Sequence, residues 1–240
     1  MRCEVWWVVW VVLVGGLSEG RLWWDKSLII WPDHQPSANL TDLTWQKLQY
    51  SGIRFIYFTL SRGQQKDARF LELAESANEF GMGVGAMHEF RAEVSPLLQH
   101  RAIEDNLRLF HYDPVPLALS IEPRDKTPGN RAELTATLYG LIVLLMPMVQ
   151  NRWRLISSID IYCSHDFWMR GVDWPTYWNP KHFSPFVLHW PLGIWLVDHE
   201  SQWPQTPPPF AYPTFWEYTN QSVLPGLPVP VRRSKVPYHL

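Results

Sequence analysis

Cysteine is nearly absent from this chain, because Cys3 and Cys163 are the two present among 240 residues. If Cys3 leaves with a cleaved leader, no internal disulfide can form and the fold must rest on its core. An excess of charge is also lacking, since 21 basic residues stand against 23 acidic ones. That balance argues against a nucleic-acid polyanion as partner. Phosphate-loop motifs, dinucleotide motifs and metal-ligand spacings are missing too, so no cofactor and no metal are expected.

Aromatic residues and proline, by contrast, are abundant. The chain has 15 Trp and 21 Pro, with the prolines concentrated toward the C-terminal third. Two interpretations of the tryptophans stay open. They can add bulk to a large core, or their flat faces can stack on the apolar faces of sugar rings.

The N-terminus is typical of a targeting segment. Met1 and Arg2 give a positive start, residues 5–14 form an apolar run, and residues 15–18 are small and flexible. The apolar run is short for a membrane span, which needs about 20 residues. We therefore expect residues 1–18 to be a signal peptide or short anchor, residues 22–240 to be a single domain, and the protein to be secreted or periplasmic.

Strand-like and helix-like segments alternate from Leu28 onward. Repeated strand–helix units predict an α/β fold with a parallel sheet, open or closed into a barrel. Segment 130–149 is predicted to be the longest helix, and its apolar run Leu141–Met146 is too short to span a membrane, so a buried helix is expected. The expected strands are 28–30, 53–60, 83–90, 116–122, 156–163, 193–197 and 213–218, and the expected helices are 41–50, 67–80, 95–110, 130–149 and 165–170.

One carboxylate ends an otherwise apolar strand. The strand Pro116–Leu–Ala–Leu–Ser–Ile–Glu122 places Ser120 and Glu122 on one face, because side chains alternate along a strand. In parallel α/β folds the functional sites lie at the C-terminal ends of the strands. Glu122 is therefore either a site residue or a solvated strand end.

Several segments together resemble the family 25 glycoside hydrolases, lysozymes that act as N-acetylmuramidases. The resemblance covers roughly residues 28–231 and implies an irregular (β/α) barrel. The matching segments, in chain order, are Leu28–Gln35 with Trp45, Ser51–Phe55, Ser61–Gly63, Asp67–Phe70, Gly85–Phe90, Leu119–Glu122, Ile161–Ser164, Phe167–Trp168, Ile194–Val197 and Trp216–Thr219.

The departures from the family pattern fall on its acids. The resemblance makes Glu122 the catalytic proton donor. The family's other carboxylates correspond here to Ile30, to Ser120, and to a position near Val229–Pro230 or Val231–Arg232. A glycosidase normally needs a second carboxyl group or a well-held substrate acetamide. The resemblance therefore implies a divergent member in which catalysis is weak or lost.

Other acids stand beside the motifs where the family has different residues. Glu89, Asp198 and Asp33 are possible replacement acids, or else solvated strand ends and surface charges. Glu217 is a further candidate, although alternation points its side chain away from Trp216 and Tyr218.

The resemblance also implies the sugar-binding residues. It points to Trp195, Trp216, Tyr218, His88 and Ser120, with Tyr57 less well supported. The aromatic rings could equally fill the end of the barrel, and a lone histidine near a strand end is commonly structural. Cys163 is expected to be a buried packing residue and not a nucleophile.

Three hypotheses on function follow. The chain is a lysozyme-like hydrolase of peptidoglycan-type amino-sugar glycans, a non-catalytic protein that binds a glycan or another protein, or a glycosidase with re-sited acids and a different substrate. The sequence leaves the oligomeric state open.

Overall fold

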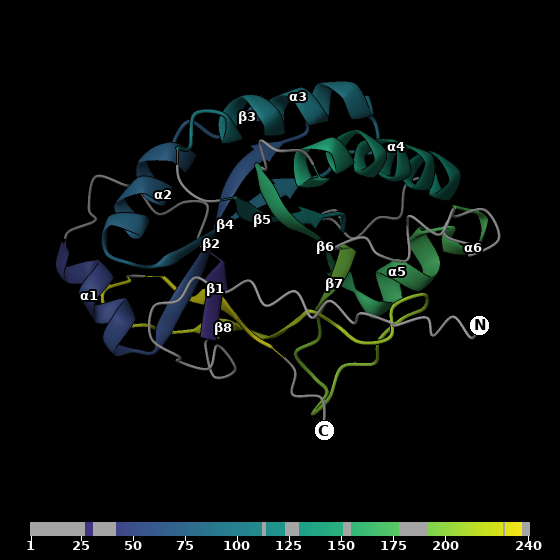
Figure 1. The fold of residues 1–240 in the computed structure, drawn as a ribbon. Helices are drawn as coiled ribbons and strands as arrows, with labels where there is room; N and C mark the ends of the chain where they lie inside the picture. Colours follow the sequence, from purple (N-terminus) through teal and green to yellow (C-terminus); the bar gives the residue numbers. More distant parts are fainter. Residues whose placement is uncertain are drawn as a thin grey trace, which may run out of the picture.

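A closed β-barrel surrounded on its outer side by helices forms the centre of the protein, as seen in a computed structural model (Figure 1). The structure describes residues 27–30, 42–111, 114–122, 130–150, 155–177, 192–227 and 229–236. Eight strands close the barrel in the order β1-β9-β8-β7-β6-β5-β4-β2, because β2 also pairs with β1. The strands are β1 (Ser27–Ile30), β2 (Ile53–Arg62), β4 (Gly83–Glu89), β5 (Val115–Ser120), β6 (Ile156–Ser164), β7 (Leu192–Val197), β8 (Phe215–Ser222) and β9 (Val231–Lys235).

Strand direction makes the barrel irregular. Strands β1, β2, β4, β5, β6, β7 and β8 pair in parallel, whereas β9 runs antiparallel to both β8 and β1. A two-residue strand, β3 (Gln65–Lys66), extends β2 as a hairpin outside the barrel. Because β9 is reversed, its first residues lie at the end of the barrel where the parallel strands finish. We call this end the C-terminal end of the barrel.

The helices lie on the outside of the strands, as the predicted strand–helix alternation requires. Figure 1 shows α1 to α5 following one another around the sheet. Between β7 and β8 the chain has no helix in residues 198–214, where prolines are frequent. The helices are α1 (Asp42–Tyr50), α2 (Phe70–Glu79), α3 (Pro96–Leu107), α4 (Arg131–Gln150), α5 (His165–Gly171) and α6 (Trp174–Tyr177).

Alternation along the strands separates two apolar clusters. The larger cluster lies between the sheet and the helices. The smaller one fills the barrel, and its buried members are Leu28, Ile30, Tyr57, Met87, Ala118, Tyr162 and Trp195. A Cβ added at Gly85 would lie 2.5 Å from the Tyr57 ring, so glycine is needed there for the ring to lie flat inside the barrel.

Local sequence signals place the helix ends. Ser95 caps α3 by accepting a hydrogen bond from the Leu98 amide at 3.3 Å, with Pro96 at the first helical position. Gly52 follows α1 with φ of 82°, the left-handed conformation that glycine tolerates.

Helix α4 is the one helix of the described residues that is long and apolar enough to cross a membrane. Half of its most apolar window is buried within the protein, where α4 contacts α3, α5, α6 and β6. These contacts agree with the prediction of a buried core helix.

Candidate functional site

Glu122 follows the C-terminal end of β5, and its carboxylate is held by the neighbouring strand. The Ser164 amide at the end of β6 donates a hydrogen bond of 2.8 Å to Glu122 Oε2. The Glu122 side chain remains partly exposed. Ser164 Oγ meanwhile accepts from the Phe167 amide at 3.2 Å and so caps α5. The Ser164 backbone is therefore a fixed support for one oxygen of the Glu122 carboxylate.

Ser120 lies at the end of β5 in register with two strand ends. Its partners across the sheet are Glu89 on β4 and Tyr162 on β6. Ser120 is partly buried, and its carbonyl accepts a hydrogen bond from the Phe90 amide at 3.0 Å. The predicted role of Ser120 in substrate binding stays a prediction.

The first two replacement acids have partners of their own. Glu89 Oε2 lies 3.6 Å from Arg62 Nε and 3.8 Å from an Arg91 guanidinium nitrogen. Asp198 Oδ1 accepts hydrogen bonds from the amides of Glu200 and Ser201, at 3.1 and 3.0 Å. Burial acts to raise the Asp198 pKa, but these hydrogen bonds outweigh it and the pKa is lowered. Both side chains therefore have local partners, and their predicted role as replacement acids stays a prediction. Asp33, the third, lies outside the described residues.

His88 does not face the barrel end, and nothing in its surroundings supports its predicted contact with substrate, which stays a prediction. The side chain is 0% exposed and lies on the outer face of β4, toward α3. Gln99 donates from Nε2 to two carbonyls, so its Oε1 must accept from His88 Nε2 at 3.0 Å. Nδ1 then accepts from Ser61 Oγ at 2.8 Å. Burial lowers the His88 pKa to about 4, against the Gln99 hydrogen bond, so this histidine is neutral and structural.

Trp195 and Trp216 lie on opposite faces of the sheet. Trp195 is 0% exposed inside the barrel, where its Nε1 donates to Ser234 Oγ at 3.1 Å. Trp216 is buried on the outer face, pairs with Leu196, and donates from Nε1 to the Asp198 carbonyl at 2.7 Å. Both rings are buried, so the structure does not support the prediction that they bind sugar, which stays a prediction.

Tyr218 and Trp203 extend the outer aromatic group. Tyr218 is partly buried and lies edge-on to Trp216, with ring centroids 6.3 Å apart. Lys235 Nζ lies 4.5 Å from the Trp216 ring centroid and 5.4 Å from that of Tyr218. Trp203, which no sequence motif singled out, is 54% exposed and contacts Trp216. Sugar binding by Tyr218 remains a prediction, and Trp203, on the same aromatic group through its contact with Trp216, is an exposed ring.

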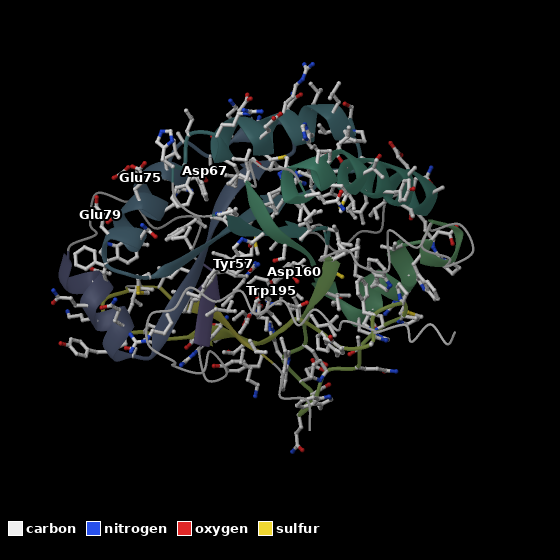
Figure 2. All side chains as sticks on the ribbon, in the orientation of Figure 1. Tyr57, Asp67, Glu75, Glu79, Asp160 and Trp195 are labelled. Carbon is white, nitrogen blue, oxygen red and sulfur yellow. The ribbon has the colours of Figure 1, made fainter. Side chains whose placement is uncertain are left out.

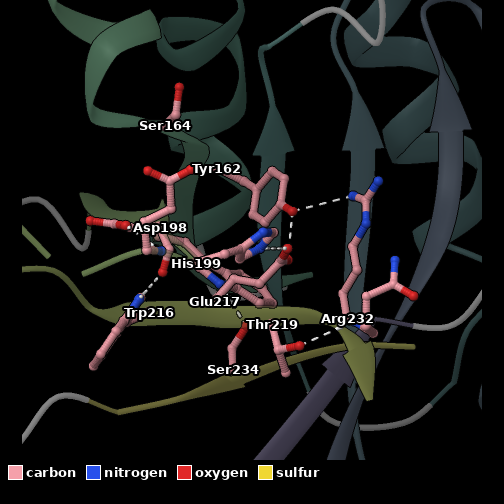
Figure 3. Close-up of polar contacts among 12 residues, drawn as sticks. Tyr162, Ser164, Asp198, His199, Trp216, Glu217, Thr219, Arg232 and Ser234 are labelled. Carbon is pink, nitrogen blue, oxygen red and sulfur yellow. Dashed lines mark hydrogen bonds and ion pairs between the residues drawn. The ribbon is translucent and has the colours of Figure 1, made fainter. Parts of the chain in front are cut away.

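Glu217 is the centre of a polar network that the sequence did not reveal (Figure 3). Its side chain is 1% exposed and points into the barrel, opposite to Trp216 as alternation predicts. Tyr162 donates its hydroxyl to Glu217 Oε2 at 2.6 Å, and His199 Nε2 lies 3.0 Å from Oε1. An Arg232 guanidinium nitrogen donates to the Tyr162 hydroxyl at 3.2 Å.

The charges around Tyr162 fix its protonation. Burial first, and then the adjacent Glu217 carboxylate, raise the Tyr162 pKa well above its ordinary value. Tyr162 therefore stays a phenol that accepts from Arg232 and donates to Glu217. These contacts join β6, β8 and β9 at one end of the barrel. Predicting that Tyr162, Glu217 and Arg232 meet requires the pairing register of β6, β8 and β9. Strand β9 and its direction were not predicted from the sequence.

A second buried carboxyl group lies deeper in the barrel. Figure 2 shows Asp160 close to Tyr57 and Trp195 at the centre of the molecule, far from the acids of α2. Asp160 is 1% exposed, and neither its Oδ2 nor the Tyr57 hydroxyl has a hydrogen-bond partner among the described residues. Burial raises the Asp160 pKa to about 7, against a hydrogen bond from Thr214. Asp160 is therefore an interior polar group, closed off from substrate.

The positions that correspond to the family's other acids hold no carboxylate. Ile30 is buried in the apolar cluster of the barrel, and Arg232 lies opposite it on β9. Cys163 is buried and free, and its pKa is raised by burial and by the charge of Glu122, as expected for a packing residue. Among the described residues, no group of three His, Cys, Asp or Glu side chains is arranged to hold a metal ion.

No protein-family model and no curated protein matches the sequence. Solved structures do match the fold. The lysozyme from Streptomyces coelicolor gives a TM-score of 0.62 at 19% identity, over 88% of this chain and 91% of that one. A family 25 glycosyl hydrolase from Bacillus anthracis gives a TM-score of 0.62 at 18% identity, over 90% of each chain.

A third match was solved with a ligand. The modular autolysin LytC from Streptococcus pneumoniae, in complex with a synthetic peptidoglycan ligand, gives a TM-score of 0.58 at 14% identity. The match covers 87% of this chain and 46% of LytC. These likenesses confirm the predicted fold: the chain has the α/β barrel of the family 25 lysozymes. At such identities the likeness concerns the fold, and the chemistry must come from the residues.

Proposed function

We propose that this protein is a lysozyme-like glycoside hydrolase directed at peptidoglycan-type amino-sugar glycans, with Glu122 as its proton donor. The fold supports this proposal, because the matching structures include lysozymes and an autolysin. The position of Glu122 supports it further, because sites in parallel α/β barrels lie where the strands end.

The observation on which the proposal depends is the environment of Glu122. One carboxylate oxygen accepts the Ser164 amide at 2.8 Å while the side chain stays partly exposed. A general acid must lie within hydrogen-bond reach of the leaving oxygen in a fixed orientation. The Ser164 amide supplies the fixed orientation, and the partly exposed side chain can deliver a proton to the glycosidic bond.

Turnover is expected to be slow. Ile30 and Ser120 stand where the resembling family has carboxylates, and neither side chain carries a charge. A lost preorganised charge typically raises the barrier by about 3–4 kcal/mol, or two to three powers of ten in rate. Two such losses would leave an enzyme that works slowly on its substrate.

The second candidate is a non-catalytic glycan-binding protein of the same fold. Ile30 favours it, because a buried aliphatic side chain at that position removes an acid from the barrel end. The third hypothesis, a glycosidase with re-sited acids, is less favoured. Glu89 pairs with two arginines and Asp198 stabilises a turn, so both have structural tasks.

Release of reducing sugars from purified peptidoglycan tests the proposal. The unmodified protein should release them, and Glu122→Gln should reduce the rate at least about a thousandfold. Glu104→Gln, an α3 surface substitution, is the matched control and should leave the rate unchanged. Absence of release, together with retention on insoluble peptidoglycan, would establish the binding protein instead. Loss of activity in Glu89→Gln or Asp198→Asn would favour the re-sited acids.

The N-terminal segment fits this function. We propose that residues 1–18 direct export of a domain that starts near residue 22, since a cell-wall substrate lies outside the cytoplasm. N-terminal sequencing of the secreted protein would locate a cleavage site if the segment is removed.

A further inference from the structure

We propose that His199, oriented by Glu217, is the general base that activates water in the reaction proposed above. This inference rests on the proposed function and adds the second half of its chemistry. It starts from the partial exposure of a histidine that is bonded to a buried carboxylate at the same end of the barrel as Glu122.

The contacts of His199 fix its tautomer. A carboxylate has only acceptor atoms, so His199 Nε2 must carry a hydrogen toward Glu217 Oε1 at 3.0 Å. In the neutral ring the lone pair is then on Nδ1. The His199 side chain is 30% exposed, and no other hydrogen bond to the ring occurs among the described residues. Nδ1 therefore carries the lone pair that can accept a proton, on a side chain that is 30% exposed.

Glu217 is built to orient this base. Its second oxygen accepts the Tyr162 hydroxyl at 2.6 Å, and Arg232 donates to that hydroxyl in turn. Tyr162, supported by Arg232, thus holds one oxygen of the Glu217 carboxylate while the other oxygen bonds to His199 (Figure 3). A histidine positioned by a buried carboxylate is the arrangement by which enzymes stabilise the imidazolium formed when the base accepts a proton.

The position of His199 relative to Glu122 suits the attack of water. Glu122 follows β5 and His199 follows β7, with β6 between them. Two strand spacings amount to about 10 Å at the backbone. Glu122 leans toward β6, where Ser164 holds it, which shortens this gap, whereas His199 leans toward β8, where Glu217 holds it, which widens it. The separation is therefore of the order of the gap of about 6.5–9.5 Å that inverting glycosidases leave between acid and base for a water molecule.

The step balances as a single displacement. Water loses a proton to His199 Nδ1, and its oxygen forms a bond to the anomeric carbon. The bond from that carbon to the glycosidic oxygen breaks, and the leaving oxygen takes the proton of Glu122. Glu122 regains a proton and His199 loses one through solvent, so the net reaction is hydrolysis with inversion at the anomeric carbon.

Chemical rescue tests this role directly. His199→Ala should lower the rate of reducing-sugar release from purified peptidoglycan by about a hundredfold or more. Added imidazole should restore much of that rate in His199→Ala and none in Glu122→Ala. His111→Ala, at an exposed histidine, is the control for both rate and thermal midpoint. A merely structural role of His199 predicts no rescue by imidazole.

Glu217→Gln gives a second, independent measurement. The amide can still accept from Tyr162, so the fold should persist, and we expect the rate to fall about tenfold. In the His199→Ala background the same change should have no further effect, because the two residues act as one unit.

The outcomes separate this inference from the function on which it rests. Full activity in His199→Ala, with activity lost in Glu122→Gln, would overturn the base and leave the hydrolase standing. A nascent product with retained anomeric configuration would do the same. An unmodified protein without any hydrolysis would remove both.

Discussion

Two glutamates at the same end of the barrel have opposite environments. Glu122, after β5, is partly exposed and accepts one backbone hydrogen bond. Glu217, on β8, is 1% exposed and is bonded to Tyr162 and His199, with Arg232 behind them. Identical side chains can serve different tasks when their surroundings differ. The exposed glutamate can exchange a proton with substrate, whereas the buried one can only orient its neighbours.

The largest expected destabilisation appears as a difference in stability between alanine variants of the two glutamates. Glu217→Ala removes the shared acceptor of a buried network, so Tyr162 loses its partner, and the free energy of unfolding should fall by about 3 kcal/mol. Glu122→Ala should lower it by less than about 1 kcal/mol, because water replaces the lost contact. Urea unfolding followed by tryptophan fluorescence measures both. Equal losses of unfolding free energy in the two variants would contradict the difference between the two environments.

The pH dependence of stability extends this comparison to a third carboxyl group, that of the buried Asp160. Its folded pKa of about 7 lies above the unfolded value near 3.9, so the folded state binds the proton more tightly. The stabilisation that comes from this tighter proton binding is fully present below about pH 4 and is lost as the pH rises to about 7. Asp160→Asn should therefore stabilise the protein by up to about 4 kcal/mol at pH 8, at about 1.36 kcal/mol for each unit of pKa difference, and have little effect at pH 4. Urea midpoints at the two pH values test this.

A midpoint difference between Asp160→Asn and the unmodified protein that does not change with pH would contradict the raised pKa. Glu122→Gln serves as the control for this measurement. This variant also removes one carboxyl group, so a midpoint shift found in Asp160→Asn and not in Glu122→Gln belongs to the buried site of Asp160.

The smallest effect is expected from a substitution that restores a carboxylate beside Glu122. Ser120 lies at the end of β5, partly buried, and occupies the position of an acid in the resembling family. Ser120→Asp should raise the hydrolysis rate about tenfold by stabilising positive charge at the anomeric carbon. Initial rates on peptidoglycan, with Ser120→Asn as the uncharged control, measure the gain. Equal rates for the two variants would show that charge at this position does not help.

Much of the fold could be predicted from the sequence, because its helices and buried strands have clear periodicity. The helix predicted at 41–50 is α1, and the one predicted at 130–149 is α4. Strand β9, Val231–Lys235, was missed since Val–Arg–Arg–Ser–Lys lacks apolar alternation and its pairing depends on distant strands. That strand closes the barrel and brings Arg232 to Tyr162.

The candidate site was predictable only in part. Alternation correctly separated Glu217 from Trp216, but it gives relative faces and cannot say which face is inside. On β8 the sequence favoured the face of Trp216 and Tyr218, and the structure places the polar network of Glu217 on the other face. His199 gave no local signal, because its partner is 18 residues away and only the β7–β8 register joins them.

The most direct test of the central claim compares two leaving groups. A proton donor is essential for a sugar leaving group and dispensable for a dinitrophenolate, which departs without protonation. Glu122→Gln should therefore lose about a thousandfold in kcat/KM on peptidoglycan fragments, yet keep most of its activity on a dinitrophenyl amino-sugar glycoside. An equal loss on both substrates would contradict the assignment of Glu122 as the proton donor.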